Sequence, residues 1–359
     1  MDTVTAPARS LVLSLAQAGL FAGRPVAGSL SPLPEAAITA APEDRTLLQR
    51  EGLLDQAGGP TAAWLPVVTT LSNPNLRLVG QTGGPSGINH LQAFGSPASQ
   101  DHLVAFTARG ERECTLAWPI EVDHVLALLT EAVGLDAPGV DPGIRLELSD
   151  QAFILLAAAL DARRELELES MLARERFAEP IISNAALTVG LKTGLQSDDQ
   201  RWLLPIFRRV LPSLPSFEQI DVARVLDELV GAAILEKDRT TGEHAFLPGF
   251  EPVRLRLQAP LGWAAFAATG LAGGKPRSAG LSALRTLGGL WGIEAAEGRV
   301  RFVTTEPARL LKGWQATIDA VRPPPEVTAA KPSARFCGSC GAALKPDWKY
   351  CGKCGAAIA

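Results

Sequence analysis

The feature that most constrains this 359-residue chain is a cluster of four cysteines within its last 23 residues. They form two C-x2-C pairs separated by ten residues, and the glycine after each pair permits the backbone of a tight turn. Two such pairs can surround one ion with four thiolates, a ligand set that favours tetrahedral zinc. The spacing therefore predicts one structural Zn²⁺ ion, bound by Cys337, Cys340, Cys351 and Cys354.

The segment around these cysteines is too short to fold on a hydrophobic core alone. Phe336, Leu344, Trp348 and Tyr350 supply almost all of its core, so we expect folding to require the metal. The segment resembles the zinc-ribbon modules common at the termini of bacterial and archaeal proteins, which implies a closed structural site and a role in interaction. A rubredoxin-like iron centre and a redox dithiol remain alternatives.

A proline tract separates this module from the rest of the chain. Three consecutive prolines begin at Pro323, and the residues after them show no apolar periodicity, which predicts a flexible tether. A second break, rich in Gly, Pro and Asp, lies at residues 134–144. The predicted parts are a first half at 1–138, a second half at 139–321, a linker at 322–335 and a zinc ribbon at 336–359.

The two halves of the body repeat one order of features. Each has a helix, a Leu-Pro pair, a strand, a glycine-rich stretch, two short extended segments joined by a turn, and a closing helix. This order predicts an α+β fold built from two pseudo-repeated halves. The matched segments are 43–54 with 222–235, 76–79 with 253–257, 103–108 with 290–295, 113–118 with 299–304, and Val122–Val133 with Pro307–Val321.

Charge and hydropathy limit the location and the partners of the chain. The formal net charge is −4; residues 331–359 carry +4, so the rest carries −8 and lacks the basic field of a non-specific nucleic-acid binder. The uncharged run at 10–23 has a poor basic leader, and we expect it to be a first, buried helix. Glycines and prolines break the longer uncharged stretches, so we expect a cytoplasmic protein with no membrane insertion.

No catalytic constellation is visible, so we expect no enzymatic activity. The glycine-rich run at 270–275 lacks both the first glycine and the final hydroxyl of a phosphate-binding loop. Cys114 lies in an alternating run, which favours a small buried hydrophobic residue over a nucleophile. None of the four histidines lies at metal-ligand spacing; they are His90, His102, His124 and His244.

The body resembles a known family in the order of its elements. A charged helix ends in Gly-Leu-Leu-Asp at 52–55, an Asn-Pro turn precedes a strand, and an Arg-Gly turn joins two further strands before an amphipathic helix. This arrangement resembles the EspG-type cytosolic chaperones of type VII (ESX) secretion. The resemblance implies a mixed α+β fold with a pseudo-two-fold, and binding to the helical tips of secreted substrate dimers. The zinc tail departs from that family.

These features predict a protein-binding adaptor or secretion-chaperone-like protein whose partner is another protein. Two Gly/Pro-rich loops, at 80–95 and 259–280, are candidates for the binding surface because glycine lets a backbone conform to a partner. Aromatic residues commonly dominate interface energetics. The candidate anchors are Phe94, Leu261, Trp263 and Phe266, with burial in the core as the alternative for Trp263 and Phe266.

An alternative function comes from residues 217–247. A helix there is followed by two short strands around a Thr-Thr-Gly-Glu turn, the arrangement of a winged helix. A winged helix with a zinc ribbon would indicate a regulator that binds nucleic acid or the transcription machinery. The segment carries a net charge of −4, whereas a phosphate-binding unit is normally basic, so nucleic acid is the less favoured partner.

Overall fold

The computed structural model describes residues 9–23, 25–26, 28–33, 41–84, 87–96, 102–109, 113–134, 143–174, 181–211, 217–322, 335–336 and 343–344. The chain divides into two units, Met1–Pro323 and Pro324–Ala359. In the second unit, β15 (Arg335–Phe336) pairs antiparallel with β16 (Ala343–Leu344).

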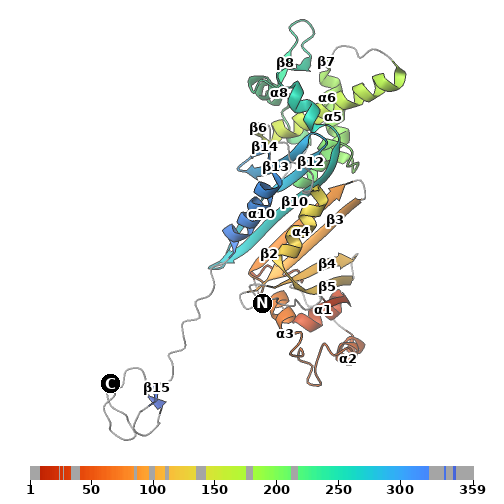
Figure 1. The fold of residues 1–359 in the computed structure, drawn as a ribbon. Coiled ribbons are helices and arrows are strands. Elements are labelled where there is room, and N and C mark those ends of the chain that lie inside the picture. Colours follow the sequence, from red (N-terminus) through yellow and green to blue (C-terminus); the bar gives the residue numbers. More distant parts are fainter. Residues whose placement is uncertain are drawn as a thin grey trace. The chain divides into compact units, whose positions relative to one another are not determined.

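One antiparallel sheet runs through the first unit (Figure 1). Within the described part of the chain it has 11 strands in the order β1-β5-β4-β3-β2-β10-β12-β13-β14-β6, and β11 pairs with β10. The strands are β1 (Arg9–Ser14), β2 (Leu76–Gly84), β3 (Gly87–Gly95), β4 (Leu103–Arg109), β5 (Glu113–Ile120), β6 (Arg145–Ser149), β10 (Pro260–Ala272), β11 (Lys275–Gly280), β12 (Ser282–Thr286), β13 (Gly289–Ala296) and β14 (Arg299–Thr304).

The two halves of this sheet have the same topology, as predicted. In the first half β2, β3, β4 and β5 form a meander that ends in α4 (Val122–Val133). In the second half β10, β11 with β12, β13 and β14 form a meander that ends in α10 (Pro307–Val321). The β2–β10 pair joins the halves antiparallel at the centre, which relates them by a pseudo-two-fold.

The repeat extends beyond the segments matched in the sequence. β1 pairs with β5 at one edge of the sheet, and β6 pairs with β14 at the other. Each edge strand ends in a serine that caps the next helix: Ser14 caps α1 (Leu15–Ala22) and Ser149 caps α5 (Asp150–Ala173). The prediction of one helix over 10–23 is therefore wrong at its start, because the Ser14 cap separates a strand from the helix.

The segment Val253–Leu257, predicted as a strand, is instead the helix α9 (Glu251–Leu257). Its alternating pattern suits a strand, but Pro252 in the first turn suits a helix start, as Pro66 does in α3 (Leu65–Ser72). The true counterpart of β2 is β10, which begins three residues after α9 ends.

The segments 80–95 and 259–280, predicted as flexible loops, are mostly strands at the centre of the sheet. Their glycines allow helices to approach the sheet closely. A Cβ atom at Gly262 would lie 2.1 Å from the carbonyl oxygen of Ala132 in α4, and one at Gly270 would lie 1.8 Å from that of Val321 in α10.

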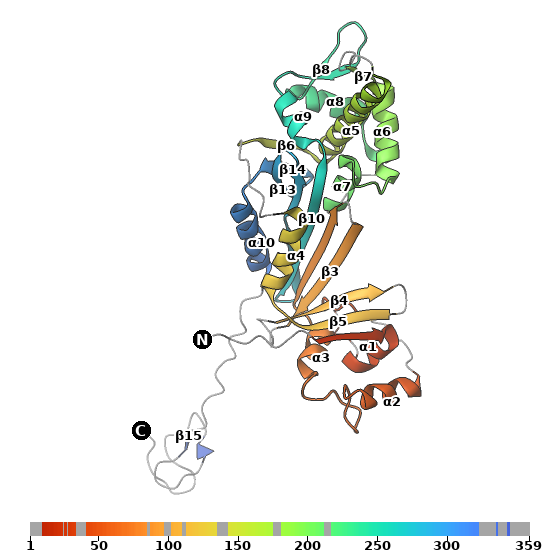
Figure 2. The same cartoon turned by 45° about the vertical axis from the view of Figure 1, so that its right-hand side comes forward.

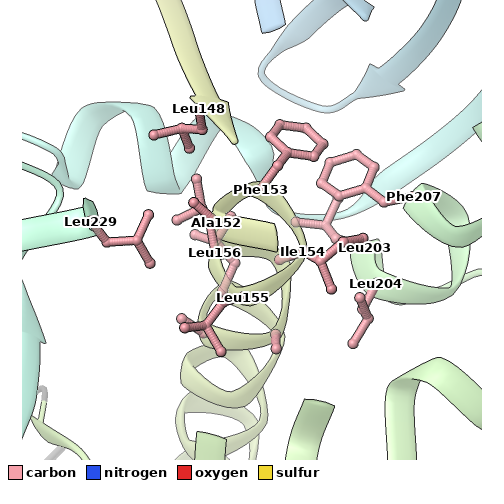
Figure 3. Close-up of a cluster of buried hydrophobic side chains, with 14 of the residues drawn as sticks. Leu148, Ala152, Phe153, Ile154, Leu155, Leu156, Leu203, Leu204, Phe207 and Leu229 are labelled. Carbon is pink, nitrogen blue, oxygen red and sulfur yellow. The ribbon is translucent and has the colours of Figure 1, made fainter. Parts of the chain in front are cut away.

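Helices inserted in the second half form a bundle around the start of α5. Residues 152–160 of α5 are buried on every side, because α7 and α8 pack around them (Figure 3). The ring of Phe153 lies 4.5 Å from that of Phe207 and 5.3 Å from that of Phe302, between centroids. These helices are α6 (Asn184–Gln196), α7 (Leu203–Val210), the 3₁₀ turn η2 (Phe217–Gln219) and α8 (Val222–Gly231).

A small sheet adjoins this bundle, in the order β7 (Ile181–Ile182), β9 (His244–Phe246), β8 (Leu235–Lys237). The helix and hairpin of the winged-helix alternative are thus present as α8, β8 and β9. At the other end of the unit, α1, α2 (Pro42–Arg50) and α3 enclose a separate core with β4 and β5 (Figure 2).

Candidate functional site

The described part of the metal module is a short hairpin around the first cysteine pair. Arg335 pairs with Leu344 and Phe336 with Ala343, so the chain entering Cys337 lies beside the chain that leaves Cys340. This pairing fits a zinc knuckle, in which two cysteines lie on one tight turn. All four predicted ligands lie outside the described residues. Within the described ranges, no three His, Cys, Asp or Glu side chains form another metal cluster.

The residues considered for catalysis lie at separate places in the fold. Cys114 is fully buried in β5, and burial raises the pKa of its thiol to about 11, which agrees with the expected small buried hydrophobic residue. The run at 270–275 contains the turn of the β10–β11 hairpin, where Gly273 and Gly274 both have positive φ. The four histidines lie apart: His90 on β3, His102 before β4, His124 on α4 and His244 on β9.

Three of the four candidate partner anchors are buried, which for Trp263 and Phe266 is the alternative that the sequence left open. Phe94 and Trp263 are fully buried and Phe266 nearly so. Trp263 and Phe266 lie on opposite faces of β10, and each face of this central strand is covered by its own hydrophobic core. The indole nitrogen of Trp263 donates a hydrogen bond to Oε1 of Gln200 at 2.9 Å. Only Leu261, which is 45% exposed, is accessible to a partner.

Leu261 lies at the rim of a hollow of about 360 Å³, which we call the α4 hollow. Its floor is formed by glycine-rich β2 and β3, and one wall is formed by α4. The predicted segments 80–95 and 259–280 therefore do meet at one surface, although they meet as strands. The lining includes Gly80, Thr82, Gly84, Gly87, Asn89, Leu91, Leu128, Glu131, Ala132 and Leu261.

A second surface, not anticipated from the sequence, lies between α5 and α6. These helices border a groove of about 440 Å³, which we call the α5–α6 groove. Leu166 and Val189 line it, and Val189 is 64% exposed. Met171 and Leu172 are also exposed, on the last turns of α5 beyond the residues that line the groove, and Leu172 is 86% exposed. The signal in the sequence was these apolar residues within the charged stretch 163–176.

One wall of the α5–α6 groove is acidic. Asp161, Glu165 and Glu169 follow one another at four-residue spacing along α5 and all line the groove. The carboxylate of Asp161 accepts the backbone N–H groups of Leu203 at 2.9 Å and Leu204 at 2.8 Å, and so caps α7. Burial raises the pKa of Asp161 to about 7, although these two donors lower it.

Behind the groove, a partly buried ionic network links α5 to α9. Arg163 donates to Oε1 of Glu167 at 3.1 Å, and the guanidinium of Arg254 contacts the same oxygen at 2.8 Å. Glu251 pairs with the other side of Arg254, which lowers the pKa of the Glu251 carboxyl. Because Arg254 is almost fully buried, this half of α5 is held firmly while its opposite face remains open to solvent.

Comparisons with known proteins agree with parts of the predictions. Residues 332–358 match the family model of the zinc-ribbon domain, which confirms the predicted resemblance of the C-terminus. No curated protein matches the chain. The chain is similar to the type VII secretion system chaperone EspG5 of Mycobacterium tuberculosis, solved in complex with a PE25-PPE41 dimer. The identity is 11%, the match covers 87% of this chain and 97% of that chain, and the TM-score is 0.44.

No helix in the described ranges is both long enough and apolar enough to cross a membrane.

Proposed function

We propose that this chain is a cytoplasmic, non-enzymatic protein-binding adaptor that holds its partner at the α5–α6 groove. This proposal rests on the exposed apolar side chains of Leu166 and Val189, which line the groove from its two helices, since grouped apolar exposure marks interaction surfaces in soluble proteins. Its zinc ribbon is a second interaction module, stabilised by one Zn²⁺ on Cys337, Cys340, Cys351 and Cys354. A reducing compartment keeps these cysteines available as thiolates.

The shape and charge of the groove favour a helical partner. A groove between two helices accepts an amphipathic helix that inserts its apolar residues between them. Glu165 and Glu169 line one wall, so the partner helix carries Lys or Arg beside its apolar stripe. A secretion-chaperone-like role is one form of this proposal, because such a chaperone shields an apolar helical surface of its substrate.

Charge insertion at the groove tests this function. The chain is purified from its native host with its bound proteins, which are identified by mass spectrometry, and the affinity of each purified partner is measured by calorimetry. Val189→Glu should weaken binding at least about tenfold, because it places a charge in an apolar contact beside an acidic wall. The matched control is Leu287→Glu, at a side chain that is 75% exposed in the β12–β13 turn.

The proposal fails if Val189→Glu and Leu287→Glu bind the partner equally well. It also fails if the purified chain turns over a small molecule instead of retaining a protein.

The second candidate function is that of a regulator that binds nucleic acid. It is favoured by the α8–β8–β9 arrangement and its third strand β7. The charge of −4 on residues 217–247 opposes it, because phosphate binding needs a basic surface.

A further inference from the structure

Strand β3 has a free edge in the middle of the large sheet. It pairs with β2 along its whole length, from Gly87 to Gly95, but with β4 only at Ala93 and Phe94. Beyond that point β4 and β5 turn away from β3 (Figure 2). Within the described part of the chain, no strand pairs with residues 87–92 on this side.

The backbone of this edge can accept another strand. In an antiparallel sheet, alternate residues direct both their N–H and C=O groups to the same neighbour. Three of the six residues at 87–92 therefore direct these groups to β2, and the other three direct them outward. Such a row of unpaired groups is a template for an added strand.

The pseudo-two-fold provides an internal comparison for this edge. β11 occupies the corresponding place in the second half, and among the strands that the structure describes it pairs with β10 alone. It carries Lys275, Pro276 and Arg277, and both charge and proline discourage strand pairing at an edge. The β3 edge has the sequence Gly-Ile-Asn-His-Leu-Gln, with no proline and no Asp, Glu, Lys or Arg. The edge of β11 thus carries residues that discourage pairing with a further strand, and the edge of β3 at residues 87–92 carries none.

The α4 hollow lies beside the free edge. Gly87, Asn89 and Leu91 of β3 form part of its floor, and Leu128 of α4 stands at its wall. Side chains of a strand added to β3 would alternate between the two faces of the sheet, so every second one would face the side of the hollow. A sheet edge usually recognises an extended peptide by two means together: main-chain hydrogen bonds to the peptide, and a pocket for one of its side chains.

We propose that the β3 edge at residues 87–92 binds an extended segment of a partner protein by strand addition, with an apolar side chain of that segment in the α4 hollow. The site is separate from the α5–α6 groove and does not depend on the function proposed for that groove. A second copy of this chain is the less favoured occupant. A six-residue strand pair spans only about 20 Å, and this contact alone falls short of the roughly 1,200 Å² typical of a stable interface.

A peptide selection with two proline variants tests the proposal. Full-length, zinc-loaded protein is used to select binders from a phage-displayed library of random peptides, and the selected peptides are synthesised. Asn89→Pro and His90→Pro are compared because adjacent residues direct their N–H groups to opposite sides of the strand. The variant that keeps the wild-type melting temperature has lost an outward N–H and should bind the peptides at least tenfold more weakly. Leu261→Asn should also weaken binding, by removing an apolar contact at the rim.

Hydrogen exchange supplies a readout that does not depend on the variants folding. Bound peptide should slow amide exchange in the segment containing residues 87–92 and leave β11 unchanged. The proposal is overturned if no peptide is selected, if the selected peptides leave exchange at 87–92 unchanged, or if they bind the stable proline variant as tightly as wild type. It is also overturned if protection of this segment depends only on protein concentration, since a second copy would then be the occupant.

Discussion

Replacement of Gly262 by alanine should destabilise the first unit, because the end of α4 rests on this residue. The new Cβ would lie 2.1 Å from the carbonyl oxygen of Ala132, whereas ordinary contacts begin near 3.4 Å, so one backbone must move by about 1.3 Å. β10 cannot move freely, because it pairs with β2 on one side and with β12 on the other. Gly262 does not have positive φ, so the effect comes from contact alone.

Overpacking of this kind costs about 1–3 kcal/mol. A unit of 323 residues unfolds with an entropy of about 0.7 kcal/mol/K, so a loss of about 2 kcal/mol lowers the melting temperature by about 3 °C. Gly270→Ala should act similarly, because its Cβ would lie 1.8 Å from the carbonyl oxygen of Val321. Denaturant titration followed by circular dichroism measures both changes.

The matched control is Gly231→Ala, in α8. A Cβ atom there meets nothing within 4 Å, and alanine in a helix gains about 0.5–1 kcal/mol over glycine. Equal stabilities of Gly262→Ala and Gly231→Ala would refute the argument that close approach of α4 requires glycine.

Three further predictions concern metal, pH and nucleic acid. Freshly purified, reduced protein should contain one zinc per chain by elemental analysis. Cys351→Ser should lose this metal, while the unfolding of the first unit should be unchanged. Wild-type protein purified without metal would contradict the predicted zinc site. Because the pKa of Asp161 is raised from 3.8 to about 7 on folding, its contribution to stability should fall as pH rises from about 4 to 7. In urea unfolding, the stability of Asp161→Asn relative to the wild type should therefore rise over this pH range. A stability difference between the two proteins that does not change with pH would contradict the prediction. In a gel-shift assay at physiological salt, the full chain at about 1 µM should not retard duplex DNA, because residues 1–330 carry a net charge of −8. Sequence-specific retardation would favour the alternative function of a nucleic-acid-binding regulator.

Local sequence patterns determined many of the elements. The extended segments around Arg-Gly and Glu-Gly turns are the hairpins β4–β5 and β13–β14, and both closing helices have the predicted bounds. These elements are specified by residues close together in the chain, through apolar periodicity and turn residues. The cysteine spacing likewise identified the zinc-ribbon domain, since ligand spacing is itself a local property.

Only the tertiary structure decided which surfaces are covered. Glycine-rich 80–95 and 259–280 resemble loops by composition, yet they form central strands, in which glycines leave room for α4 and α10. Trp263 and Phe266 were plausible anchors until both faces of β10 proved to be covered. Conversely, Leu172 is exposed, and among the described residues no second strand pairs with 87–92, because β4 pairs with β3 only at Ala93 and Phe94. Burial and edge pairing depend on neighbours far away in the chain, which a local pattern does not contain.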